Sequence, residues 1–148
     1  MKKVLWCVAA VYMFMFSSSS FAMDAAAVDD NTYNVVLLCM GDAGDYCNQY
    51  QTVNDEFVFD DGDFSLESFE DELWGMGGDG SYSESGISFS ADFEVVNDDL
   101  DMYEFDITGV QVLGQIIVGT AEIEFYEWDI IDYDKEGDAT AYFFGIKK

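Results

Sequence analysis

Apolar and polar residues alternate with a period of two along much of the chain. The clearest stretch is residues 87–95, and the pattern recurs in 103–107 and 117–125. Successive side chains of a strand point to opposite faces of a sheet, so this alternation is typical of antiparallel strands with one buried face. In the clearest stretch the buried face is predicted to carry Ile87, Phe89, Ala91, Phe93 and Val95.

Turn-forming residues separate these runs, with candidate turns at 60–62, 75–80, 97–99 and 135–137. A sheet with one apolar face must bury it against another layer or by closing on itself. We therefore predict an all-β fold, an antiparallel meander that closes into a small up-and-down β-barrel of about eight strands or folds as a sandwich. Part of 40–51 is assigned to a helix. The predicted strands are 33–39, 52–59, 63–69, 72–76, 80–84, 86–96, 101–109, 115–127 and 139–146.

Three segments together resemble a known architecture. They are FVFDDGDFSL (57–66), a glycine-rich stretch that ends in Gly80-Ser81-Tyr82, and ISFSADF (87–93). Their order is similar to that of small, lipocalin-like (calycin-type) bacterial β-barrel proteins. The resemblance covers roughly residues 52–146 and is architectural, because the Gly-x-Trp signature of lipocalins and its packing arginine are absent. It implies a barrel whose interior could hold a ligand.

The first 22 residues have the three-part layout of a secretory signal peptide. Lys2 and Lys3 precede an uncharged apolar run at 4–16, and Ser20-Phe21-Ala22 supplies the small residues of a cleavage site. The run is shorter than the roughly 20 residues of a membrane-spanning helix. We expect residues 1–22 to be removed and 23–148 to form a single secreted or periplasmic bacterial domain, with no membrane span after cleavage.

Cys39 and Cys47 are the two cysteines outside the predicted signal peptide. Two cysteines in an oxidising compartment usually pair, and glycines between them allow the chain to turn back. A Cys39–Cys47 disulfide is therefore predicted.

Acidic residues dominate the charge of the chain. There are 31 Asp and Glu residues against 5 Lys and Arg, a formal net charge of −26. No basic patch is present to bind nucleic acid or anionic lipid. An outer-membrane barrel is disfavoured because one face of each predicted strand is rich in acids and serine. Three interpretations of the acidity remain: a solubilising surface, divalent-cation binding, and recognition of a cationic protein partner.

The residue types needed for several kinds of catalysis are missing. The chain has no histidine, which excludes Ser-His-Asp and Cys-His sites, and no phosphate-binding glycine-lysine loop. Acidic residues are so abundant that no pair stands out as a catalytic acid and base. We expect a protein that is not an enzyme.

The apolar face of the predicted barrel offers candidate ligand contacts. An eight-stranded interior is only just wide enough for side chains, so the same rings could simply fill it. Both interpretations stay open. The candidate ligand-binding residues are Phe89, Phe93, Tyr103, Phe105 and Phe125, with Tyr142 and Phe144 predicted on the same inner face.

One acidic segment resembles the start of a calcium loop. Asp132, Asp134, Glu136 and Asp138 alternate along it, but a strand pattern follows, and Phe143 occupies the position where an EF-hand needs glutamate. The segment is predicted to be a hairpin tip, with calcium binding by these four carboxylates as the alternative.

These observations predict a secreted or periplasmic, non-enzymatic β-barrel that binds a small apolar ligand or a protein partner. The alternative is an acidic, calcium-dependent structural or interaction protein, which includes an inhibitor of a basic secreted enzyme. The sequence does not indicate an oligomeric state.

Overall fold

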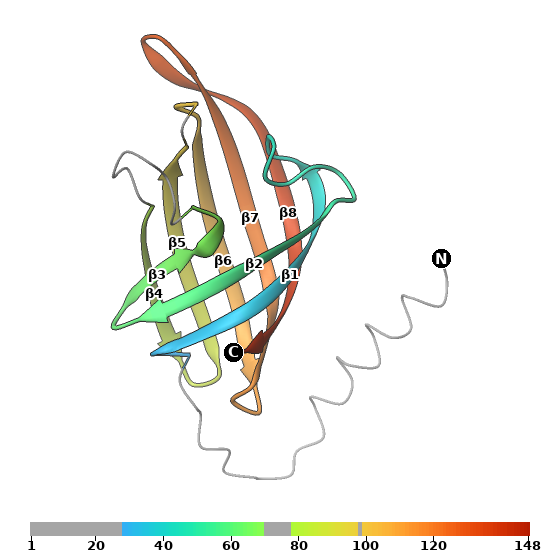
Figure 1. Ribbon diagram of the computed structural model, residues 1–148, viewed down its shortest axis with the longest axis vertical. Helices are drawn as coiled ribbons and strands as arrows, with labels where there is room; N and C mark the ends of the chain where they lie inside the picture. The colour runs from blue at the N-terminus through green and yellow to red at the C-terminus, as the bar shows by residue number, and fades with distance from the viewer. Residues whose placement is uncertain (1–27, 70–77, 98) are drawn as a thin grey trace.

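The computed structural model describes residues 28–69, 78–97 and 99–148 (Figure 1). It shows a ring of eight antiparallel strands in which each strand pairs with its neighbours in sequence and β1 closes the ring against β8. The predicted all-β meander is confirmed. Its elements are β1 (Asn31–Asp42), β2 (Thr52–Asp60), β3 (Asp63–Leu66), the 3-10 turn η1 (Glu67–Phe69), β4 (Asp79–Ser85), β5 (Ser88–Val96), β6 (Met102–Val112), β7 (Ile116–Asp129) and β8 (Asp132–Lys147).

Two sequence predictions fall outside this part of the chain. The signal peptide at 1–22 and the strand predicted at 72–76 both lie outside the described residues. Within the described residues, no helix is long and apolar enough to span a membrane.

The helix predicted within 40–51 is wrong. β1 continues to Asp42, and the chain then turns back so that Ala43 pairs with Cys47. The Ala43 N–H donates to the Cys47 carbonyl at 2.8 Å, and a disulfide joins Cys39 to Cys47 with their Cα atoms 5.5 Å apart. The predicted disulfide is confirmed, and it is consistent with a protein outside the cytoplasm.

The hairpin turn predicted at 135–137 is also wrong. β7 and β8 remain paired as far as Asp129 and Asp132, so the turn consists of Ile130 and Ile131. Further along, Phe125 pairs with Gly137 while the next residue pairs with Lys135, which leaves Glu136 as the extra residue of a β-bulge. The glycine that suggested a turn therefore belongs to a bulge inside β8.

The inward side chains form one aromatic core. Its members include Tyr33, Phe57, Phe59, Phe64, Phe89, Phe93, Tyr103, Phe105 and Phe143, none more than 4% exposed. Two inward glycines make room for this packing, because a Cβ on Gly109 would lie 2.6 Å from the Phe89 ring and one on Gly119 would lie 2.7 Å from the Phe143 ring. The core thus fills the ring with buried side chains from the other seven strands, and β4 adds the half-buried Tyr82.

The residues predicted to lie on the inner face of β8 were assigned wrongly. Ala139, Ala141 and Phe143 point inward, whereas Tyr142 and Phe144 lie on the outer surface with 57% and 45% of their area exposed. Residues 141–144 are apolar on both faces, so alternation alone cannot assign the faces. Ile87, also predicted to be buried, lies in the β4–β5 turn and is 44% exposed.

The segment after β1 packs over one end of the core. The Tyr46 ring contacts Phe69, Tyr103 and Phe105, with centroids 5.2–6.3 Å away. Its hydroxyl donates to the Asp55 carboxylate at 2.6 Å. Burial, reinforced by the charge of Asp55, raises the pKa of Tyr46 well above its usual value, so Tyr46 stays a neutral donor.

Candidate functional site

Four of the five residues predicted to bind a ligand are linked by ring contacts, and Phe89 packs separately against other rings of the core. The Phe105 ring lies 5.8 Å from Phe93 and 6.4 Å from Tyr103, and Tyr103 lies 5.0 Å from Phe125. Phe89 contacts Phe59 at 5.3 Å. Centroid separations of this size are those of packed aromatic pairs. Ligand binding by these rings stays a prediction.

The four carboxylates predicted to bind calcium lie along the start of β8. Asp132, Asp134, Glu136 and Asp138 are all exposed, and the strand spreads them along its length. Among the described residues, no group of three or more histidine, cysteine, aspartate or glutamate side chains is arranged to hold a metal ion. Calcium binding by these four residues also stays a prediction.

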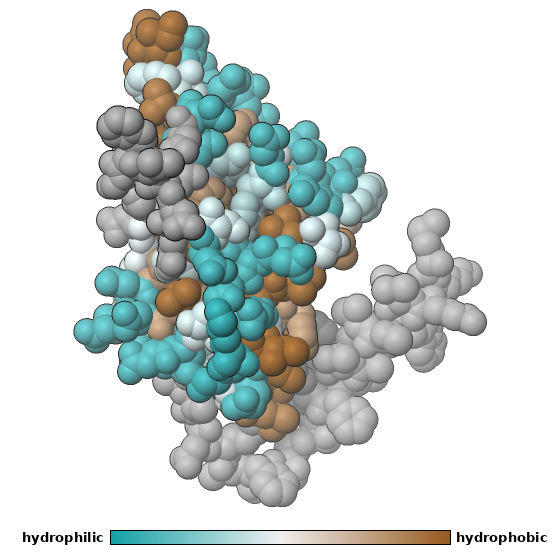
Figure 2. Space-filling view, in the orientation of Figure 1, coloured by the Kyte–Doolittle hydropathy of each residue, from teal (hydrophilic) through white to brown (hydrophobic). Residues whose placement is uncertain are grey.

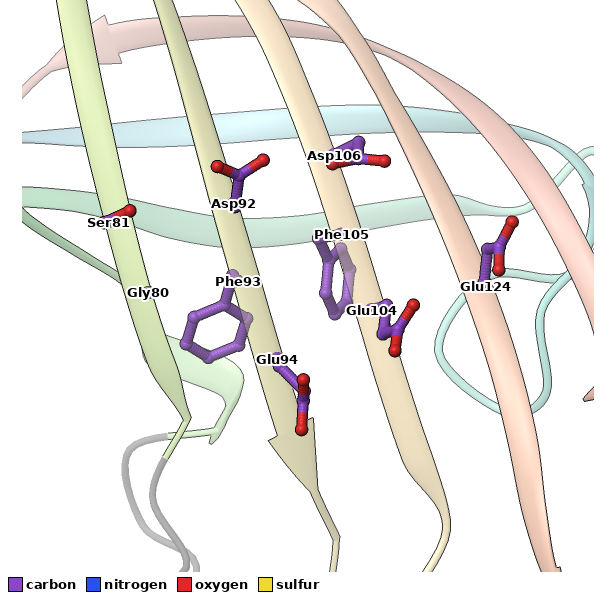
Figure 3. Close-up of a pocket in the computed structure, with 9 residues that line it drawn as sticks. All are labelled: Gly80, Ser81, Asp92, Phe93, Glu94, Glu104, Phe105, Asp106 and Glu124. Atoms are coloured by element: carbon purple, nitrogen blue, oxygen red, sulfur yellow. The ribbon is translucent and has the colours of Figure 1, made fainter. Parts of the chain in front are cut away.

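A second set of carboxylates lies across three neighbouring strands. Register places Asp92 of β5 opposite Asp106 of β6, which is opposite Glu122 of β7. Two residues along each strand, Glu94, Glu104 and Glu124 form a second row that is aligned in the same way (Figure 3). Side chains directly opposite each other on a sheet have Cβ atoms roughly 4.5–5.5 Å apart. We call this set the acidic face; it consists of Asp92, Glu94, Glu104, Asp106, Glu122 and Glu124.

The acidic face is formed by the outward half of the same alternation that builds the core. Ala91 and Phe93 point inward on β5, and Phe105 and Ile107 do so on β6. The carboxylates therefore point away from the core. An open surface depression lies here, lined by five of the six carboxylates together with Gly80, Ser81, Phe93 and Phe105.

Electrostatics within the acidic face are unfavourable at its centre. A hydrogen bond with Asp92, burial, and the charges of Asp92 and Glu122 raise the pKa of Asp106. At its edge, Glu124 pairs with Lys135 at 2.7 Å, and that contact holds the pKa of Glu124 below its usual value. Like charges directly opposite each other destabilise a sheet. The alignment thus opposes folding, and a counter-charge from a partner would relieve it.

The Asp92–Asp106 contact predicts a measurable pH dependence. Because the pKa of Asp106 is raised in the folded state, its contribution to stability falls as pH rises through that pKa and is recovered on acidification. Asp106→Asn should therefore raise the melting temperature at pH 7 and reduce the gain in stability that this carboxyl contributes on acidification through its raised pKa. Thermal melts of both proteins measure this, with Asp61→Asn in the β2–β3 turn as control. Parallel pH profiles for all three proteins would contradict it.

The β7–β8 hairpin projects beyond the rest of the ring (Figure 1). Its tip consists of Ile130 and Ile131, which are 84% and 88% exposed, and the end of the molecule where this hairpin projects is coloured hydrophobic in Figure 2. Just below the tip, the Trp128 and Tyr133 rings lie 5.0 Å apart across the hairpin. We call Ile130 and Ile131 the hairpin tip.

The residues of the hairpin tip do not suit the turn that they form. Two-residue hairpin turns favour Asn-Gly or similar pairs, yet Ile130 adopts a positive φ of 51°. A β-branched residue with positive φ is a rare, strained conformation. The hairpin tip therefore combines a strained backbone with two highly exposed apolar side chains. In the sequence, the tip is two consecutive isoleucines between aspartates. These isoleucines were not predicted to form a turn, because the glycine of residues 135–137 indicated a turn there.

The structure thus has two distinctive exposed features: an aligned set of carboxylates across β5, β6 and β7, and an apolar tip at the end of the β7–β8 hairpin. Comparisons of the chain with protein-family models, with curated proteins and with solved structures found no match.

Proposed function

We propose that this protein is a non-enzymatic, extracytoplasmic β-barrel that binds a cationic protein through its acidic face and hairpin tip. The observation that carries the proposal is the alignment of six carboxylates in two rows across β5, β6 and β7. Such an alignment costs stability in the free protein, and lysine or arginine side chains of a partner would offset that cost.

The packed interior supports binding on the outside. Phe93, Tyr103 and Phe105 are at most 3% exposed and are in contact with other rings, so a ligand would have to displace core side chains. A partner could reach the exposed carboxylates of the acidic face, which are Asp92, Glu94, Asp106 and Glu122, without displacing core side chains.

The two surfaces would contribute to different steps of binding. Complementary charge mainly accelerates encounter and makes the association rate depend on salt. Buried apolar anchors mainly slow dissociation. The acidic face therefore governs association, and Ile130 and Ile131 govern dissociation. Asp129 and Asp132, which flank the tip, favour a pocket with basic residues at its rim.

Surface plasmon resonance against a panel of small, secreted basic proteins tests the proposal. The acidic-face variant Glu94→Gln/Glu104→Gln/Glu122→Gln should lower the association rate about 10-fold at low salt, with a smaller effect at high salt. The matched control Asp60→Asn/Asp61→Asn/Asp63→Asn removes the same charge from the β2–β3 hairpin and should change the rate about 2-fold or less. Ile131→Ser should accelerate dissociation while leaving association nearly unchanged.

Equal effects of the two charge variants would show that total charge and not the acidic face attracts basic proteins. Unchanged dissociation of Ile131→Ser would remove the hairpin tip from the binding site. Absence of binding to every protein of the panel, with tight binding of an apolar small molecule, would favour the ligand-carrier alternative.

A further inference from the structure

A second exposed surface differs in chemistry from the acidic face. It is formed by the outward side chains of the two strands that close the ring, β1 and β8. Register places Val36 opposite Phe144 and Leu38 opposite Tyr142. Each side chain is 42–57% exposed. We call this set the β1–β8 face; it consists of Val36, Leu38, Met40, Tyr142, Phe144 and Ile146.

Apolar residues of β7 continue this surface. Val118 pairs with Phe144, and Ile116 pairs with Ile146, both at half-buried positions. In Figure 2, apolar atoms are exposed among hydrophilic ones over the part of the ring where β1 and β8 lie in Figure 1. The exposed apolar surface thus spans three neighbouring strands.

The border of the β1–β8 face is polar, and it is acidic at one end. Glu122, Asp42 and Asp138 lie at that end, beyond Met40 and Thr140. The other outward neighbours on β1, β2, β7 and β8 include the uncharged Asn34, Asn54, Thr52, Thr120 and Thr140. The nearest carboxylate on β2, Glu56, is held by Lys148, whose Nζ lies 2.7 and 2.8 Å from its two oxygens. An apolar centre with a polar rim is the usual anatomy of a protein–protein interface.

We propose that the β1–β8 face binds the same face of a second copy of this chain, forming a two-fold symmetric dimer. Six large side chains, each about half exposed, present on the order of 500 Å² of apolar surface. With its rim the face approaches the roughly 800 Å² per partner of a standard stable interface. A self-complementary patch of this kind suits an isologous contact.

The charge distribution favours self-association through this face over the rest of the surface. Asp and Glu outnumber Lys and Arg by 26, so two copies repel each other over most of their surfaces. Between Asn34 and Met40 on β1, and between Thr140 and Ile146 on β8, no outward position is acidic. Contact here places the acidic faces, centred on β6, further around each ring and leaves them open to partners.

Sedimentation velocity of the secreted, disulfide-bonded protein over a dilution series tests the dimer. We expect a reversible monomer–dimer equilibrium that shifts toward dimer as sodium chloride screens the repulsion, since the Debye length falls from about 10 Å at 0.1 M to about 3 Å at 1 M. Phe144→Glu should raise the dimer dissociation constant about 30-fold or more, because it places a charge in the apolar centre.

Matched variants separate the interface from general effects. Ile87→Glu adds the same charge at a side chain of nearly equal exposure (44% against 45%) in the β4–β5 turn, and it should leave the equilibrium within about 3-fold of wild type. Tyr142→Ser adds no charge and should weaken the dimer without affecting the circular dichroism spectrum. A wild-type protein that stays monomeric at high salt overturns the proposal, as does a dimer equally sensitive to Ile87→Glu and Phe144→Glu. Monomers that instead bind neutral phosphatidylcholine vesicles through this face would overturn it in favour of a lipid surface.

Discussion

Phe105→Ala should lower the free energy of unfolding by about 3–5 kcal/mol, the usual cost of emptying a buried aromatic position. Phe105 is 2% exposed and lies within 6.4 Å, ring to ring, of Tyr46, Phe69, Phe93 and Tyr103. Because rings surround it on several sides, the core cannot collapse into the space without moving several strands. Urea denaturation followed by tyrosine and tryptophan fluorescence measures the change.

The control for this prediction is the same substitution on the outer surface. Phe144→Ala removes an equal side chain that is 45% exposed, and it should cost about 1 kcal/mol or less at dilutions where the protein is monomeric. If Phe105→Ala were as mild as Phe144→Ala while abolishing binding of a hydrophobic dye, the ring would line a ligand cavity and the packed-core account would fail.

Removal of the disulfide has the second largest expected effect. Cys39→Ala/Cys47→Ala should lower the free energy of unfolding by about 2–3 kcal/mol, because the bridge closes a loop with a sequence separation of 8 and so restricts the unfolded chain. Alanine avoids burying new hydroxyl groups at two positions that are fully buried. Denaturation of the variant and of the oxidised parent in the same buffer gives the difference.

Local hydrogen bonds predict what the disulfide-free protein retains. Cys39 donates its N–H to the Gln51 carbonyl at 2.9 Å and accepts from the Tyr50 N–H at 3.0 Å, so the backbone of 43–51 stays tied to β1. The variant should therefore keep the circular dichroism spectrum of the parent. Equal stability of the two proteins would mean that these backbone bonds, and not the covalent bridge, hold the segment.

The strands and the disulfide were predictable because their signals are local. Period-two alternation in 89–95 correctly indicates one buried and one exposed face, because the outward residues there are polar. The same signal fails in 141–144, where both faces of β8 are apolar. There the outer surface of β8 carries the same residue types as the core.

The acidic face escaped prediction for a different reason. Alternation shows that Asp92, Asp106 and Glu122 point outward, but only the register of three strands places them in one row. Register depends on where the turns lie and how long they are. The turn predicted at 135–137 is instead a bulge at Glu136, so the register of β7 and β8 could not be derived from the sequence. With 31 acidic residues in the chain, composition alone could not single out six of them.

Native mass spectrometry of the protein purified from its own cells tests most directly whether the barrel acts through its outer surface. The account predicts a protein with an intact disulfide and no bound small molecule, together with a complex that contains a basic protein. The acidic-face variant should lose that complex, and the Asp60→Asn/Asp61→Asn/Asp63→Asn control should retain it. A stoichiometric apolar ligand or calcium ion retained by the wild type, with no basic protein, would contradict the account.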